Sequence, residues 1–207
     1  MLNIVEKIID IIFPPRDTEK RVRLLCDLGE NLESNEFKFR DQYYLCDYTD
    51  KDVRATVIEN KYHHNSRAAQ LAAKTIARWL ESQDRDTKYV LVPIPLGARR
   101  QQDRGYNQVS EILKALPVMD NVVIDESLLL RTRDTTAQTT LEKHERLANM
   151  VDAFSCPHPE QLHNYSDRTI VIIDDVTTTG ATLGVARAAL EPIVPETTKV
   201  LCLALAH

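Results

Sequence analysis

Residues 171–183 read "VIIDDVTTTGATL" and join an apolar run to two carboxylates and a threonine-rich turn. The β-branched run before Asp174 is typical of a buried strand. After Asp174 and Asp175 come the turn and Gly180, and from Ala181 the apolar residues recur at helical spacing. The pattern predicts a strand, a polar turn and a helix, and its two charges at a strand end indicate a ligand site.

Strand and helix patterns alternate along much of the chain. We expect further strands at residues 88–95, 121–131 and 199–206, and helices at residues 65–80, 105–116, 140–150 and 181–193. This alternation predicts an α/β fold with a mostly parallel β-sheet and helices on both faces. Ligands of such sheets bind at the carboxyl ends of the strands, where Asp174 and Asp175 lie. Residues 14–50 show no clear period, and within them residues 37–48 fit either a short hairpin or an irregular cap.

The turn after the two acids suits a phosphate group. Amides at a helix start attract anions, threonine hydroxyls add donors, and Gly180 allows close approach of the backbone. Carboxylates repel phosphate but accept hydrogen bonds from hydroxyls, so the expected ligand resembles ribose 5-phosphate. The other interpretation is that the threonines cap a helix and the acids are solvated. The candidate ribose and phosphate residues are Asp174, Asp175, Thr177, Thr178, Thr179, Gly180, Ala181 and Thr182.

Composition narrows the class of protein. A chain of 207 residues, 43% of them hydrophobic, is long enough for one substantial core and a small appendage. The net charge of −5 argues against direct binding of nucleic acid. The four cysteines occur singly, which favours reduced thiols and a cytoplasmic location. Charged residues interrupt the apolar N-terminal pattern, so we expect no signal peptide and no association with a membrane.

Three segments resemble one known family. The stretch at 171–183 resembles the signature of type I phosphoribosyltransferases, which bind 5-phospho-α-D-ribosyl 1-pyrophosphate (PRPP). "VPIPLGARRQQDRGYNQVSEILKAL" (92–116) and "RTRDTTAQTTLEKHERLANMVDAF" (131–154) are similar to segments of the ComF-like competence and GntX-like family. With "VIENKYHHNSRAAQLAA" upstream, the resemblance covers about residues 48–207 in one order. It implies the type I phosphoribosyltransferase fold.

The chain departs from that family at its N-terminus. Family members begin with a zinc ribbon of paired C-x-x-C motifs, whereas residues 1–50 contain only Cys26 and Cys46. We therefore expect residues 1–50 to form a small irregular segment with a degenerate or missing ribbon, followed by a phosphoribosyltransferase-like domain at 51–207. Other histidines and cysteines offer alternative zinc ligands, but we expect no zinc. These are His63, His64, Cys156, His158 and His163.

The resemblance also implies the chemistry. Mg²⁺ is expected to bind through PRPP and water rather than directly to the protein. Asp174 and Asp175 are expected to hold the ribose hydroxyls and the hydrated metal, and to favour positive charge on the ribosyl ring as pyrophosphate leaves. Capping explains Asn107 without a ligand. The expected pyrophosphate-binding residues are Leu96, Gly97, Ala98, Arg99, Arg100, Arg131 and Arg133.

Two functions remain open from the sequence. In the first, the protein is a phosphoribosyltransferase that acts on an unidentified acceptor and releases pyrophosphate. In the second, it is a non-catalytic PRPP-binding or adaptor protein associated with competence and DNA uptake, as the family resemblance implies. The acidic charge balance counts against direct contact with DNA and so favours an enzyme or a PRPP sensor. The oligomeric state stays open, with a homodimer among the expectations.

Overall fold

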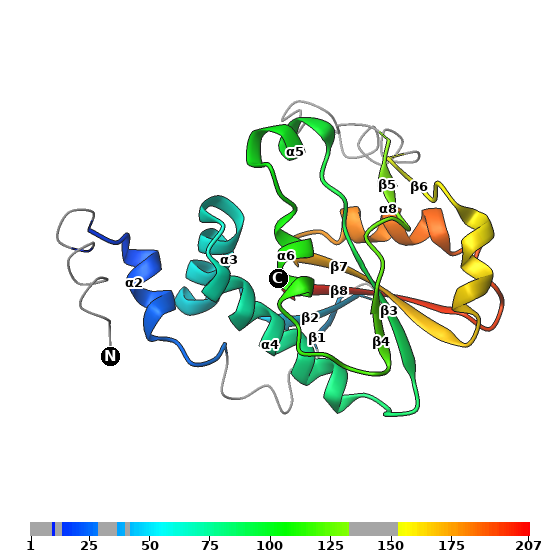
Figure 1. Cartoon of the computed structure of the whole chain (residues 1–207), viewed down its shortest axis with the longest axis horizontal. Helices are drawn as coiled ribbons and strands as arrows, with labels where there is room; N and C mark the ends of the chain where they lie inside the picture. The colour runs from blue at the N-terminus through cyan, green and yellow to red at the C-terminus, as the bar shows by residue number, and fades with distance from the viewer. Residues whose placement is uncertain (1–9, 11–13, 29–36, 40–41, 133–152) are drawn as a thin grey trace.

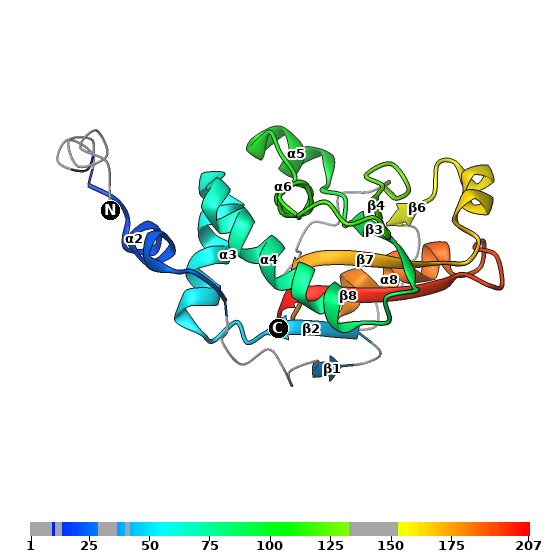
Figure 2. The same cartoon turned by 60° about the horizontal axis from the view of Figure 1, so that its bottom comes forward.

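A computed structural model describes residues 10, 14–28, 37–39, 42–132 and 153–207. Its centre is a six-stranded sheet in the order β1-β2-β8-β7-β3-β4, which Figures 1 and 2 show from two directions. The strands of this sheet are β1 (Phe37–Phe39), β2 (Gln42–Cys46), β3 (Lys88–Pro93), β4 (Val122–Ile124), β7 (Arg168–Val176) and β8 (Lys199–Ala206). All neighbouring pairs are parallel except β1 with β2. The predicted mostly parallel sheet is confirmed.

Strand β7 lies between β8 and β3, with Ile173 paired to both Leu203 and Pro93. Its residues from Ile170 to Ile173 are at most 1% exposed. Such a run buries both faces of the strand, as the β-branched pattern predicts. Because β7 is parallel to both neighbours, its carboxyl end lies in the middle of the sheet edge, beside the carboxyl ends of β8 and β3.

Helices cover both faces of the sheet. Helices α4 (Ser66–Ser82) and α6 (Gln108–Lys114) pack against one face in a core that includes Ile76, Ile112 and Ile173. Helix α8 (Ala181–Leu190) packs against the other face, where Leu183 and Leu190 join a second core. Asn65 caps α4 through hydrogen bonds from the amides of Arg67 and Ala68. These features confirm the predicted α/β class.

The N-terminal part contributes to the sheet and to its helical cover. Strands β1 and β2 form the hairpin that was one of the two alternatives for residues 37–48, and β2 pairs in parallel with β8. Helix α2 (Asp17–Leu24) packs on α3 (Lys51–His63), and buried Glu59 of α3 accepts hydrogen bonds from Arg16 and Thr18. Part of the predicted segment 1–50 is thus integral to the sheet.

Several elements differ from the sequence prediction. Helix α3 was not predicted, because its apolar residues lie on no single face. The strand predicted at 121–131 is two strands, β4 and β5 (Leu130–Arg131), and β5 pairs with β6 (Phe154–Ser155). A short helix, α5 (Ala98–Arg104), was not predicted. The 3-10 helix η2 (Pro159–Tyr165) was also missed, and the helix predicted at 140–150 lies outside the described residues.

Across the described ranges, no helix combines the length and the apolar character needed to span a bilayer.

Candidate functional site

The two acids at the end of β7 have different surroundings. Since side chains alternate along a strand, Asp175 shares a face with Ile173, and Asp174 faces the other side. The carboxylate of Asp175 is 5% exposed and lies 3.5 Å from the ammonium of Lys61. Gln108 donates a hydrogen bond from Nε2 to Asp175 Oδ2 at 3.3 Å. Asp175 is therefore held by helices α3 and α6, whereas Asp174 Oδ1 accepts a hydrogen bond from the backbone amide of Asp175 at 2.8 Å.

Burial and a neighbouring negative charge shift the pKa of Asp174. Burial raises the pKa of Asp174 well above its usual range, and the negative charge of Asp175 raises it further. The ammonium of Lys61 acts in the opposite direction but does not cancel the shift. A further positive charge close to these carboxylates is therefore favoured, as is a hydroxyl that donates a hydrogen bond.

The threonine loop is a turn that starts α8. Gly180 is the N-cap residue, with a left-handed φ of 73°. Its amide donates to Thr177 Oγ1 at 3.1 Å, and the amide of Ala181 donates to Thr179 Oγ1 at 3.4 Å. Thr177 is buried, whereas Thr178 and Thr179 are exposed. The predicted turn and helix start are confirmed, and the loop presents threonine side chains at the amino end of α8.

Gln42 of β2 supports this loop from beneath. Its Nε2 donates to the carbonyl of Gly180 at 2.7 Å, and its side chain is buried. A Cβ built at Gly180 would lie 2.5 Å from Gln42 Oε1. We expected Gly180 to make room for a ligand, but the first group that its missing side chain accommodates is Gln42. The sequence did not indicate this contact, because 138 residues separate the partners.

The predicted pyrophosphate loop is partly helical. Gly97 is the N-cap of α5, so Ala98, Arg99 and Arg100 lie in its first turn rather than in a loop. The residues from Ala98 to Arg100 are exposed, and Arg99 lies 3.9 Å from Asp103. Helix α5 was not predicted, because "ARRQQDR" has no apolar residue beyond Ala98 to reveal a helix, and the role of these residues toward pyrophosphate stays a prediction. The arginines nevertheless follow the end of β3, next to β7 in the sheet.

Of the two more distant arginines, the structure describes one. Arg131 lies in β5, and its guanidinium carbon is 5.4 Å from the centre of the Phe154 ring on β6. Strand β6 contacts α8, the helix that begins at the threonine loop. Arg133 lies outside the described residues.

The start of α6 contacts both the segment after β3 and the acid pair at the end of β7. Asn107 caps α6 by accepting from the amide of Val109 at 2.9 Å, and it donates to the carbonyl of Ile94 at 2.8 Å. This confirms the capping interpretation of Asn107. Arg104 donates to Gln108 Oε1 at 2.8 Å, so the amide that holds Asp175 is itself held. Lys61 and Gln108, like Gln42, were not among the predicted site residues, although Lys61 and Gln108 lie in segments that carry the family resemblance.

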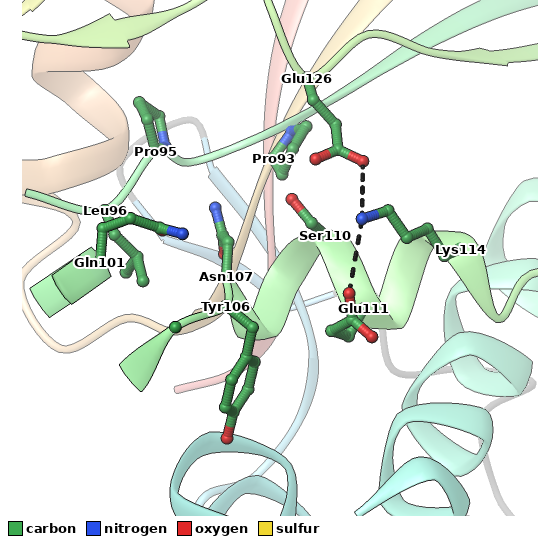
Figure 3. A pocket seen from close by; sticks show the side chains of 11 residues that line it. Pro93, Pro95, Leu96, Gln101, Tyr106, Asn107, Ser110, Glu111, Lys114 and Glu126 are labelled. Carbon is green, nitrogen blue, oxygen red and sulfur yellow. Dashed lines mark hydrogen bonds and ion pairs between the residues drawn. The ribbon is translucent and has the colours of Figure 1, made fainter. Parts of the chain in front are cut away.

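A cavity of about 330 Å³ lies beside this site, at the ends of β3 and β4. Figure 3 shows Lys114 between the carboxylates of Glu111 and Glu126, at 3.4 Å and 3.3 Å. Leu96 and Asn107 also line it, but Asp174 and Asp175 do not. The cavity therefore lies on the β4 side of the loop after β3, away from the acid pair.

The cysteines and histidines form no recognisable metal centre in the described ranges. No group of three or more His, Cys, Asp or Glu residues there is arranged to hold a metal ion. Cys26 is exposed and Cys46 is buried in β2, where burial raises the pKa of its thiol to about 12. The expectation that the protein binds no zinc stays a prediction.

A parallel sheet with an acid pair and a threonine loop at one strand end defines a phosphoribosyltransferase-like protein. Residues 60–207 match the family described as "Phosphoribosyl transferase domain". Competence protein F of Haemophilus influenzae is 31% identical over 118 residues, which are 53% of this chain and 51% of that protein. DNA utilization protein YhgH of Salmonella typhimurium is 30% identical over 164 residues, 77% of this chain and 69% of that protein.

Competence protein ComFC of Bacillus subtilis is 32% identical over 105 residues, which are 51% of this chain and 39% of that protein. The chain spans about half the length of Competence protein F and of the YhgH protein of Escherichia coli O157:H7. The chain belongs to the ComF-like family of type I phosphoribosyltransferase-fold proteins.

Proposed function

We propose that the protein binds PRPP at the end of β7 and transfers its 5-phosphoribosyl group to an acceptor with release of pyrophosphate. The observation that carries this proposal is the joint position of the acid pair and the threonine loop. Asp174 and Asp175 lie a few residues before Gly180, which has a left-handed backbone, and before the amino end of α8. A phosphate at the helix start and ribose hydroxyls at the carboxylates satisfy both groups at once.

The residues also fit a magnesium ion carried by PRPP. Mg²⁺ prefers oxygen ligands and keeps several waters, so it needs few ligands from the protein. Burial and the charge of Asp175 raise the pKa of Asp174, and a nearby cation would favour its charged form. Asp174 and Asp175 would hold the hydrated ion through its waters, and the ion would neutralise charge on the pyrophosphate group.

The chain's own residues then have distinct roles in the proposed reaction. Amides at the start of α8, with the hydroxyls of Thr178, Thr179 and Thr182, bind the 5-phosphate. The carboxylates accept from the ribose hydroxyls and stabilise positive charge on the ring as the bond to pyrophosphate breaks. Arg99 and Arg100 supply charge for the departing pyrophosphate, since a guanidinium can bind two phosphate oxygens at once.

A variant without the two negative charges tests this proposal. Replacing both Asp174 and Asp175 by Asn keeps the shape of the side chains and removes their charge. We expect calorimetric affinity for PRPP with Mg²⁺ to fall at least tenfold, while affinity for ribose 5-phosphate, which carries no pyrophosphate, falls less. Unchanged PRPP affinity in a variant that unfolds like the wild type would contradict the proposal.

A second candidate function is favoured by the names of the relatives. Those proteins are named for competence and for DNA utilization. In this alternative the protein binds PRPP without catalysis and acts as an adaptor in competence and DNA uptake, in the cytoplasm and without direct contact with DNA. Pyrophosphate release from PRPP and Mg²⁺ with a panel of nucleobases separates the two candidates. Release with one base supports the enzyme, and binding of PRPP without release under any base supports the adaptor.

A further inference from the structure

The ammonium of Lys61 lies beside the acid pair, where the Mg²⁺ ion carried by PRPP is expected to bind. Its ammonium is 3.5 Å from Asp175 Oδ2, and its side chain is 27% exposed. It comes from α3, more than 100 residues before the acid pair in the sequence. The contact therefore depends on the fold and not on a local motif.

Neighbouring contacts hold Lys61 in this position. The preceding residue, Asn60, is buried and donates from Nδ2 to the carbonyl of Gln108 at 3.0 Å. Tyr106 donates from its hydroxyl to the carbonyl of Asn60 at 2.9 Å. The end of α3 is thus fastened to the start of α6, which also supplies the Gln108 amide to Asp175. Because this backbone is anchored, we expect the Lys61 side chain to keep its position when a ligand binds.

The positive charge of Lys61 should weaken the binding of a free divalent cation by Asp174 and Asp175. Two carboxylates at the end of one strand attract a divalent cation, because carboxylate oxygens are preferred ligands of Mg²⁺. One ammonium beside them offsets part of the negative charge of the pair, and opposite charges this close interact strongly when partly buried. The acid pair then attracts a free divalent cation less strongly, and the cation must compete with the ammonium of Lys61.

We propose that Lys61 is a built-in counter-cation of the acid pair, a positioning residue that keeps Asp175 fixed and prevents the pair from collecting a free divalent cation. The proposal rests on the proposed function, because it concerns how the same acid pair is prepared for PRPP. On this account the site responds to a metal that arrives with the pyrophosphate group, and binds the metal alone weakly.

Calorimetric titration with MgCl₂ alone tests this role, with MnCl₂ as a second probe. Lys61→Met removes the charge at similar length, and Lys61→Arg keeps the charge. We expect Lys61→Met to bind either ion at least tenfold more tightly than the wild type, and Lys61→Arg to resemble the wild type. A purely structural ion pair would instead lower the melting temperature of Lys61→Met without tightening metal binding.

A matched control is available on α4. Lys74 is also ion-paired, but its ammonium lies 3.1 Å from Asp27 rather than beside the acid pair. Lys74→Met should therefore bind the ions like the wild type. If Lys61→Met does not fold, Lys61→Gln provides the same neutral comparison and retains a hydrogen-bond donor.

Two outcomes would overturn the proposal. The first is equal affinity of the neutral Lys61 variants and the wild type for the metal alone. The second is tightening in Lys61→Arg as large as in Lys61→Met, since side-chain shape rather than charge would then be responsible. Neither titration contains PRPP, so a wild-type protein that fails to bind PRPP would contradict the proposed function without deciding the role of Lys61.

Discussion

Two glycines with nearly the same backbone angle mark the two loops of the site. Gly180, after β7, has a φ of 73°, and Gly105, at the end of α5 after β3, has a φ of 77°. A Cβ at Gly180 would lie 2.5 Å from the buried side chain of Gln42, whereas a Cβ at Gly105 would meet nothing within 4 Å. Both glycines thus adopt a left-handed conformation, but Gly180 is packed against Gln42 and Gly105 is exposed.

If the protein binds PRPP as proposed, this difference gives the two loops different roles. The threonine loop is supported by Gln42 and by an internal hydrogen bond to Thr177, so its shape is fixed by the fold itself. The segment after β3 presents exposed Arg99 and Arg100 on a short helix with no buried residue. We infer that the first loop contributes shape to recognition and the second contributes charge.

Substitution of the two glycines should give the largest contrast. Any residue with a Cβ in the left-handed region costs about 1–2 kcal/mol in folding free energy, and both Gly180→Ala and Gly105→Ala incur this cost. Gly180→Ala must also displace Gln42. We expect it to lower the melting temperature more than Gly105→Ala and to reduce PRPP affinity at least tenfold. Thermal unfolding and calorimetry measure the two effects.

The double variant Gln42→Ala/Gly180→Ala separates the collision from the backbone strain. It removes the side chain that the new methyl group would meet, so part of the loss in PRPP affinity should return relative to Gly180→Ala. Equal effects of the two glycine substitutions on stability and binding would show that packing against Gln42 is unimportant. They would also remove the difference between the two loops.

Removal of charge from the loop after β3 should have a smaller effect. The exposed positions of Arg99 and Arg100 predict almost no change in melting temperature for Arg99→Ala/Arg100→Ala. Affinity for PRPP should fall severalfold, and its dependence on salt concentration should weaken, because two screened charges are lost. Calorimetry at two salt concentrations measures this. A large loss of affinity for ribose 5-phosphate would instead assign these arginines to the 5-phosphate.

The parts that the sequence predicted have local signals. The apolar run of β7, the threonine turn and the start of α8 lie in one contiguous stretch whose residue types dictate their conformations. Asn65 and Asn107 could likewise be recognised as helix caps, because a cap is defined by its neighbours. Strand and helix alternation then sufficed for the α/β class.

The parts that the sequence missed depend on partners distant in the chain or on weak local patterns. Gln42 and Lys61 reach the site only because β2 joins β8 and α3 packs beside α6, and neither contact leaves a periodic signal. Helix α5 has no buried residue, so hydrophobic spacing did not reveal it. Local chemistry therefore predicted the threonine loop, while its supports required the tertiary structure.

A crystal structure of the wild-type protein with PRPP and Mg²⁺ would show where the ligand binds. We expect the 5-phosphate against the loop from Thr178 to Thr182, with the ribose hydroxyls toward Asp174 and Asp175. We also expect Gln42 and Gly180 to keep their contact, since this loop is already formed. PRPP bound away from the end of β7, or a threonine loop without phosphate in crystals that hold PRPP elsewhere, would contradict the proposed function.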